Sequence, residues 1–440
     1  MNNDEIVRGF CKVLDSCETR SRAELQAQHI TMLERLCRHA WQTTPFYKQR
    51  LKLLFDDDGA FRLEAWKDVQ PLTRRELLEE FESLRSSDVP KNFGGLLFAE
   101  TSGSTGQPVR ALWTDTQQIA TQCVIRRFDQ WNASEPHGLM VTISGRPISS
   151  GPTEYEEEHW APVYKALGQP GRHVNINAQL PTDHLWKRLE EIKPQHLKVR
   201  PQQLLAIANI YLSRSLRPSF ELATIRLYGE PRGKSDDDTI AKVFGTRPLS
   251  NYSAEEVGHV ALECPDCRRY HVVDEVTHVD VVDDANQPVG AGDIGRILTT
   301  PLYSYAMPLI RYELGDEVRL GEADCHRSQS VDIAEIMGRR ADLFHHPDGG
   351  LFRPTALVLT QTSSLLGAAA IQIVQFDPNR FLVRYQADDV PGIDARKGAV
   401  SQVQDAFGFR ANVSLERVAE IPAMANGKRN VFVCEIQNPD

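Results

Sequence analysis

Six consecutive residues between two apolar segments carry side chains suited to holding an anion. They lie in "AETSGSTGQPVRALWT" (99–114) and are Thr101, Ser102, Gly103, Ser104, Thr105 and Gly106. Glycine permits the backbone dihedrals at which several N–H groups converge on one point, and hydroxyl groups add further donors. Such a loop favours an oxyanion, most often phosphate. It is not a P-loop, because no lysine follows the second glycine, and a plain hairpin turn between "GLLFAE" and "VRALWT" is the alternative.

A second group of residues has the composition of a metal site. The segment "ECPDCRRYHVVDE" places Cys264, Cys267 and His271 within eight residues. Thiolates and an imidazole at this spacing suit tetrahedral Zn²⁺, with Cys325 as the fourth ligand and His326 as its rival. Reduced, buried cysteines are the alternative. Because the eight cysteines are scattered along a long chain, we do not expect a disulfide framework.

Alternating helices and strands must position these groups. Apolar spacing predicts helix in 21–54, interrupted at Pro45, and another helix over 201–214 that begins at Pro201. Thr73, with Glu76 three residues later, predicts a capped helix start. Buried strands are expected at 138–145 and 224–230. The pattern indicates an α/β layered domain.

The predicted secondary structure changes in character twice toward the C-terminus. After Glu255, several segments alternate with period two and predict a β-rich region. Beyond about residue 338 the sequence predicts a hairpin around Asp377–Asn379, a helix ending at Gly408 and two further strands. We therefore expect two domains, 1–337 and a small α+β domain over 338–440.

Composition excludes several classes of partner. The 440 residues carry a net charge of −10 and no long basic run, which argues against nucleic acid as the main partner. No apolar stretch approaches the ~20 residues of a membrane span, and "MNNDEIVRGFCKVLDSCETR" lacks the pattern of a secretory signal. We therefore expect no membrane partner and a cytoplasmic protein.

In several motifs the exact order of the residues is more informative than the composition. "TSGSTGQP" resembles the phosphate-binding signature T-S-G-[ST]-T-G-x-P of the adenylate-forming enzymes. "SNYSAEEVGHVALECP" is similar to the tyrosine–glutamate segment of the phenylacetate–CoA ligase branch. "MPLIRYELGD", "IMGRRADLF" and "IPAMANGKRNVFV" resemble, in the family's order, the ribose-binding, hinge and C-terminal lysine segments. The resemblance spans about residues 20–438.

The resemblance implies a fold and an activity. The fold would be a large multi-sheet adenylation domain with a β-rich subdomain, followed by a small, mobile C-terminal domain that acts as a lid. The activity would be activation of a small, perhaps aromatic, carboxylic acid by ATP to acyl-AMP, with release of pyrophosphate and transfer to coenzyme A. Transfer to an amine, an amino acid or a carrier-protein thiol is the alternative, and a nucleotide-binding module without catalysis is a third hypothesis. Related enzymes are often homodimers.

The resemblance also assigns roles to residues. The 101–106 loop would hold the β- and γ-phosphates, and Asp316 would bind the ribose hydroxyls. Arg339 would reach the ribose or the phosphates, and Lys428 would enter the site to neutralise the reacting groups. Residues of the adenine and nucleotide pocket would be Gly229, Glu230, Pro231, Asn251, Tyr252 and Ser253.

Two departures from the family pattern leave questions open. Glu255 replaces the usual threonine before Glu256, so either carboxylate could bind Mg²⁺, although the spacing from Tyr252 favours Glu256. The first hinge aspartate corresponds to Ala341. The acid pocket is expected to be lined by 138–147, by "VNINAQL" and by the segments around Tyr228 and Ser250, with Ser144 and Arg146 as candidate polar contacts.

Overall fold

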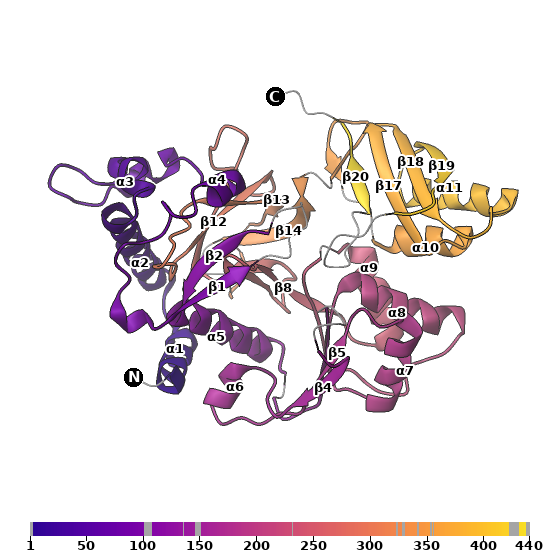
Figure 1. Ribbon diagram of the computed structural model, residues 1–440, viewed down its shortest axis with the longest axis horizontal. Coiled ribbons are helices and arrows are strands. Elements are labelled where there is room, and N and C mark those ends of the chain that lie inside the picture. The colour runs from indigo at the N-terminus through magenta and orange to yellow at the C-terminus, as the bar shows by residue number, and fades with distance from the viewer. Residues whose placement is uncertain are drawn as a thin grey trace. The chain divides into compact units, whose positions relative to one another are not determined.

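The computed structural model describes residues 3–100, 108–134, 136–145, 151–230, 232–322, 324–327, 331–340, 343–352, 354, 356–421 and 431–436. The chain forms two compact units (Figure 1). The first comprises Met1–Leu139, Glu156–His173 and Leu249–Ile336, and the second comprises Met140–Tyr155, Val174–Pro248 and Met337–Asp440. The boundary expected at residue 338 stays a prediction.

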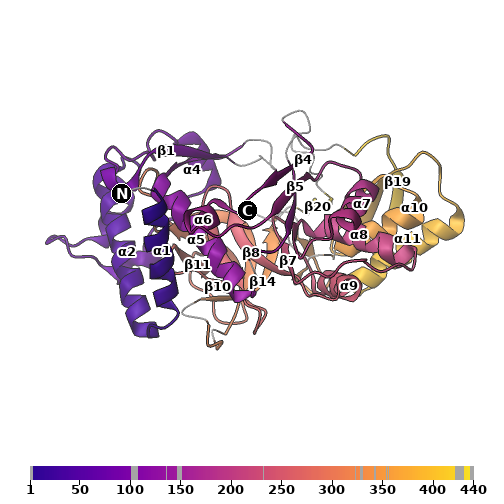
Figure 2. The same ribbon diagram turned by 90° about the horizontal axis from the view of Figure 1, so that it is seen from below.

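Helices of the first unit come mostly from its N-terminal third. Ser21 and Thr73 cap α2 and α4 through capping boxes with Glu24 and Glu76, so the sequence-based start at Thr73 is confirmed. The helix expected over 21–54 ends at Thr43, and short turns follow Pro45. The elements are α1 (Asn3–Cys17), α2 (Arg22–Thr43), α3 (Tyr47–Arg50), η1 (Lys52–Leu54), η2 (Leu63–Asp68), α4 (Arg74–Glu79), η3 (Lys91–Phe93), α5 (Asp115–Trp131) and α6 (Pro162–Ala166). Figure 2 shows α1, α2 and α5 side by side.

Two sets of strands belong to this unit. A two-stranded antiparallel hairpin is formed by β1 (Leu96–Glu100) and β2 (Arg110–Thr114). The β-rich region predicted after Glu255 forms a sheet in the order β11-β12-β13-β14-β10-β9-β8. Its strands are β8 (Leu249–Ala254), β9 (Gly258–Glu263), β10 (Tyr270–Val272), β11 (Thr277–Val282), β12 (Ile294–Pro301), β13 (Tyr312–Leu320) and β14 (Asp332–Arg339).

The second unit contains a sheet with a parallel centre. Its strand order is β7-β6-β3-β5-β4, and β3, β6 and β7 run parallel to one another. Their near-continuous burial is typical of parallel strands. The elements are β3 (Met140–Ser144), β4 (Glu154–Glu157), β5 (His173–Asn177), α7 (Thr182–Ile192), β6 (His196–Val199), α8 (Pro201–Ser213), β7 (Thr224–Leu227) and α9 (Lys234–Phe244). The expected start at Pro201 is confirmed.

Residues 344–432 contribute a separate hydrophobic core built around Phe344, Phe381 and Phe432. The hairpin expected around Asp377–Asn379 is present, and α11 ends at Gly408, whose φ of +75° suits glycine. The elements are β15 (Phe344–His345), β16 (Leu351–Phe352), α10 (Ala356–Leu366), β17 (Ala370–Asp377), β18 (Arg380–Gln386), α11 (Ile393–Phe407), β19 (Asn412–Arg417) and β20 (Phe432–Cys434). The four long strands lie in the order β19-β18-β17-β20.

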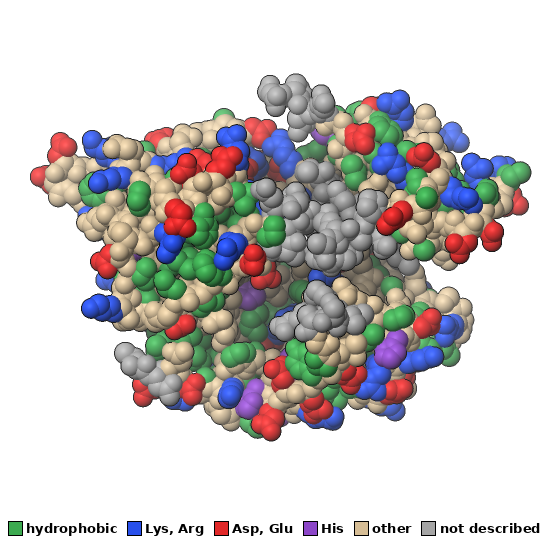
Figure 3. Space-filling model, in the orientation of Figure 1, with side chains coloured by type: hydrophobic (Ala, Val, Ile, Leu, Met, Phe, Trp, Pro, Cys, Tyr) green, Lys and Arg blue, Asp and Glu red, His purple; other side chains and the backbone are tan. Residues whose placement is uncertain are grey.

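Three general expectations can be compared with the structure. All eight cysteines are free thiols, as expected. None of the helices in the described ranges combines the length and apolar character that a membrane span requires. On the face shown in Figure 3, acidic and basic side chains are interspersed rather than gathered by sign.

Candidate functional site

The hydroxyl-rich segment separates β1 from β2 in the sequence. Thr101, Ser102, Gly103, Ser104, Thr105 and Gly106 are themselves outside the described residues, but both flanking strands are described. Glu100 is paired in register with Arg110, and their side chains approach to 3.9 Å. The strands on either side of this segment therefore pair as an antiparallel hairpin, and the anion-binding role of the segment stays a prediction.

Tyr252 and Asp316 lie in direct contact within the first unit. The Tyr252 hydroxyl donates to Asp316 Oδ2 at 2.6 Å, which joins β8 to β13. Tyr252 is buried and Asp316 is partly exposed. The two residues expected beside the adenine and the ribose are thus brought together from positions 64 residues apart.

A bulge in β13 sets the direction of Asp316. Arg296 pairs with Glu317 and Leu298 with Glu313, so three residues of β13 lie opposite one residue of β12. Gly315, within this bulge, has a φ of +80°, which glycine adopts without strain. Bulges of this kind redirect a side chain near a functional site. Period-two alternation in the sequence could not have predicted this change of direction.

Glu256 forms a second link between the β8–β9 turn and β13. Tyr312 donates its hydroxyl to Glu256 Oε1 at 3.0 Å, and the Trp113 indole donates to the Glu256 carbonyl at 3.1 Å. Burial and the neighbouring carboxylate raise the pKa of Tyr312, so its hydroxyl remains a donor. The other oxygen of Glu256, Oε2, accepts no hydrogen bond from the described residues.

The neighbouring carboxylate differs in environment. Glu255 lies at the start of the turn and is exposed, whereas Glu256 is only 5% exposed. Tyr252 and Glu256 both contact β13, through Asp316 and Tyr312 respectively. The geometry therefore groups Glu256, rather than Glu255, with the Tyr252–Asp316 pair.

The remaining nucleotide-binding candidates are distributed as follows. The Asn251 amide is 3.1 Å from Nδ1 of His259 and 3.4 Å from the Ser253 hydroxyl, so it is held on the β8–β9 hairpin. In the second unit, Gly229 has a φ of +73° and follows β7, and Oε2 of Glu230 is buried without a hydrogen-bond partner. Arg339 ends β14 and is partly exposed. Pro231, Ala341, Lys428 and Arg146 lie outside the described residues.

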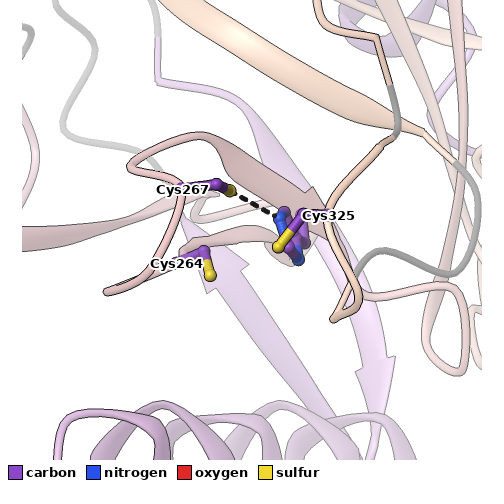
Figure 4. A group of neighbouring side chains, drawn as sticks. Cys264, Cys267 and Cys325 are labelled. Atoms are coloured by element: carbon purple, nitrogen blue, oxygen red, sulfur yellow. Dashed lines mark hydrogen bonds between the residues drawn. The ribbon is translucent and has the colours of Figure 1, made fainter.

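Cys264, Cys267, His271 and Cys325 form one cluster (Figure 4), with their ligand atoms all within 4.8 Å of one another. Cys264 follows β9, Cys267 lies in the turn and His271 is on β10, so a single hairpin supplies three of the four. The Cys267 sulfur is 3.1 Å from Nε2 of His271. His326 is exposed, close to Asp266, and is not part of the cluster.

Burial makes these thiols weak acids in the absence of a cation. Removal from water raises the pKa of Cys264 and raises that of Cys267 to about 12, while burial lowers the pKa of His271. The buried Asp332 lies 3.4 Å from Nε2 of His271. Three thiols and one imidazole match the donor set of a closed zinc site.

Sequence comparison finds similar proteins of known name. The chain is 25% identical over 335 residues to a phenylacetate-coenzyme A ligase of Thermus thermophilus, covering 74% of this chain and 73% of that protein. It is 24% identical over 355 residues to the enzyme of the same name from Escherichia coli, covering 75% and 74%. The chain is thus similar to enzymes of the phenylacetate–CoA ligase-like branch of the adenylate-forming superfamily.

A solved structure confirms the α/β fold over nearly the whole chain. A 2-hydroxyisobutyryl-CoA ligase in the postadenylation state, in complex with an acyl-AMP, superposes with a TM-score of 0.71 at 19% identity, covering 95% of this chain and 91% of that one. No family model matches the sequence.

Sequence reasoning missed three partners within this adenylate-forming site. Tyr312 and Trp113 fix Glu256, and His259 contacts Asn251. Tyr312 lies within "MPLIRYELGD", close to Asp316, which was a usable signal. Trp113 gave none, because its partner is 143 residues away in sequence.

Proposed function

We propose that this protein activates a small carboxylic acid, with aromatic acids as candidates, with ATP, forming acyl-AMP and pyrophosphate, and then transfers the acyl group to coenzyme A. The observation that carries the proposal is the Tyr252–Asp316 contact, because it unites two residues of different family motifs in one site. Similarity to the phenylacetate–CoA ligase-like branch supports coenzyme A as the acceptor.

The chemistry requires two anions to meet, and the residues divide that task. The 101–106 loop would hold the β- and γ-phosphates by backbone and hydroxyl donors. Asp316 would accept hydrogen bonds from the ribose, with Tyr252 beside the base. Lys428 would neutralise charge at the α-phosphate, and we infer that it arrives on a mobile C-terminal domain over 338–440.

Side chains of this protein would suit two kinds of metal ion, Mg²⁺ and Zn²⁺. Mg²⁺ prefers carboxylate oxygen, and Oε2 of Glu256 accepts no hydrogen bond from the described residues while Oε1 accepts one from Tyr312. When bound, the ion would supply charge neutralisation on the phosphates. Zn²⁺ fits the Cys264, Cys267, His271 and Cys325 cluster, where it would fasten the β9–β10 hairpin to the segment that carries Cys325.

The product identifies the acceptor. The protein is incubated with ATP, Mg²⁺, a panel of acids and one acceptor at a time (coenzyme A, an amine or amino acid, or a carrier protein), and the products are identified by mass spectrometry. We expect acyl-CoA and AMP, and we expect Lys428→Ala to lose both, whereas the exposed Lys397→Ala should not. An amide, or an acyl group on a carrier protein, would establish the alternative acceptors. ATP binding without turnover of any acid would contradict catalysis.

Two further attributes belong to the same proposal. A cytoplasmic location follows from the need for ATP and coenzyme A as cosubstrates. A homodimer is expected from related enzymes, and sedimentation of the purified chain tests it.

A further inference from the structure

Three parallel strands of the second unit end at a common edge. β6 pairs in register with β3 on one side and with β7 on the other. Gly145, Arg200 and Tyr228 each follow the carboxyl end of one of these strands. In open parallel sheets, ligands bind outside the carboxyl ends of the strands.

Side chains at this edge form a cationic cluster around one tyrosine. Tyr228 donates its hydroxyl to the Ile143 carbonyl at 2.8 Å, and Nζ of Lys198 lies 5.3 Å from the centre of its ring. The Arg200 guanidinium interacts with the Tyr228 hydroxyl and lies 3.5 Å from the position that a β-carbon would take on Gly145. Glycine at 145 therefore leaves room for the guanidinium.

The charge partners of Arg200 can be compared with those of three other arginines in the same unit. Arg188, Arg214 and Arg232 each form an ion pair with a carboxylate. Within the described ranges, Arg200 forms none, although it is partly buried. A guanidinium is always charged and offers five donors in a planar fork that matches a carboxylate.

We propose that Arg200 is a specificity-determining residue that binds a second anionic group of the acid substrate, remote from the carboxylate that reacts with ATP. The substrate class is then a dicarboxylic acid, whose distal carboxylate pairs with Arg200 at the carboxyl edge of β3, β6 and β7. The inference deepens the proposed function and rests on it, since it concerns the acid that is activated.

Matched pairs of acids test this inference. Acid-dependent ATP–pyrophosphate exchange is measured with benzoate against terephthalate and with butyrate against succinate, for the wild type, Arg200→Met and Arg200→Lys. We expect the wild type to prefer the dicarboxylic member of at least one pair. For Arg200→Met, kcat/KM for the dicarboxylic acid should fall about 10- to 100-fold, mainly through a higher KM. For the matched monocarboxylic acid, kcat/KM should stay within about twofold of the wild-type value. Arg200→Lys should recover part of the loss.

Controls separate binding from folding. Arg247→Met removes an exposed arginine of the same unit, which pairs with Asp238. This substitution should leave kcat/KM unchanged for both acids of a pair. If Arg200→Met does not fold, Arg200→Gln keeps a polar side chain and provides the same comparison.

The outcomes distinguish this inference from the proposed function. An equal loss for both members of a pair, or no loss for either, would overturn the role of Arg200. Wild-type exchange with unsubstituted acids alone would overturn the dicarboxylic class and leave adenylation intact. Absence of exchange with every acid would overturn both.

Discussion

Two tyrosine–carboxylate hydrogen bonds define the site at the scale of single residues. They run in opposite directions between the same elements: Tyr252 of β8 donates to Asp316 of β13, and Tyr312 of β13 donates to Glu256 of the β8–β9 turn. Each carboxylate is therefore oriented by a tyrosine hydroxyl from the neighbouring element. Pre-orientation of this kind favours a charged cosubstrate without later rearrangement.

The first prediction concerns Asp316. Replacement by Asn keeps the size of the side chain and an acceptor for Tyr252, but removes the charge that would strengthen hydrogen bonds to the ribose. We expect Asp316→Asn to lower kcat/KM for ATP by about 10- to 100-fold. Exchange kinetics at varied ATP measure this, with the exposed Asp348→Asn as control. An unchanged kcat/KM for ATP would show that Asp316 does not touch the nucleotide.

The sequence singled out the candidate site residues more readily than the residues that contact them. Tyr252, Glu256 and Asp316 stood out because each lies in a short motif. Trp113 and His259 did not, because a hydrogen bond across a fold leaves no local pattern. The bulge at Gly315 was likewise hidden, since it depends on how β13 pairs with β12.

At the scale of elements, the cysteine cluster links a hairpin to a segment distant in sequence. The β9–β10 hairpin, including its turn, supplies three donors, and Cys325 lies in the connection between β13 and β14. Metal binding at such a site contributes directly to the free energy of folding, since the unfolded chain does not hold the donors together.

The second prediction is that one equivalent of zinc co-purifies with the chain. Elemental analysis of the wild type should find it, and Cys264→Ser or Cys325→Ser should lose it. Removal of the ion by a chelator should lower the thermal unfolding midpoint, because the buried thiols then lose their common ligand. The exposed His326→Ala should retain zinc. A metal-free wild type with an unchanged midpoint after chelation would contradict the site.

The third prediction concerns the contact of α2 with β11. His29 hydrogen-bonds through Nδ1 to the Asp274 carbonyl, and its Nε2 is 2.8 Å from Nδ1 of His278. Burial first, and His278 second, lower the pKa of His29 to about 4 from its ordinary 6.5. In that interval the unfolded chain binds a proton that the folded chain does not. The free energy of unfolding should therefore fall as pH falls from about 6.5 to about 4, by about 3 kcal/mol in full.

Urea unfolding as a function of pH measures this contribution. His29→Gln should flatten the decline in that interval relative to the wild type, while stability above it changes by a constant amount. Parallel pH profiles for the two proteins would show that His29 does not carry the effect.

At the scale of the whole molecule, motif order in the sequence predicted the family, and the comparisons confirmed it along with the α/β fold. Period-two and helical patterns placed the helices and strands, including the helix at Pro201 and the hairpin at Asp377–Asn379. The sequence could not assign strand order in the β-rich region, because β14 inserts between β13 and β10 through non-local pairing. It also did not single out Arg200, whose proposed role depends on its having no carboxylate ion-pair partner among the described residues.

Acid-dependent exchange of pyrophosphate into ATP tests the central claim most directly, because it reports the reversible formation of acyl-AMP without any acceptor. The account predicts exchange with at least one small carboxylic acid and its loss in Lys428→Ala. Absence of exchange with every acid, or exchange by Lys428→Ala at the wild-type rate, would contradict it.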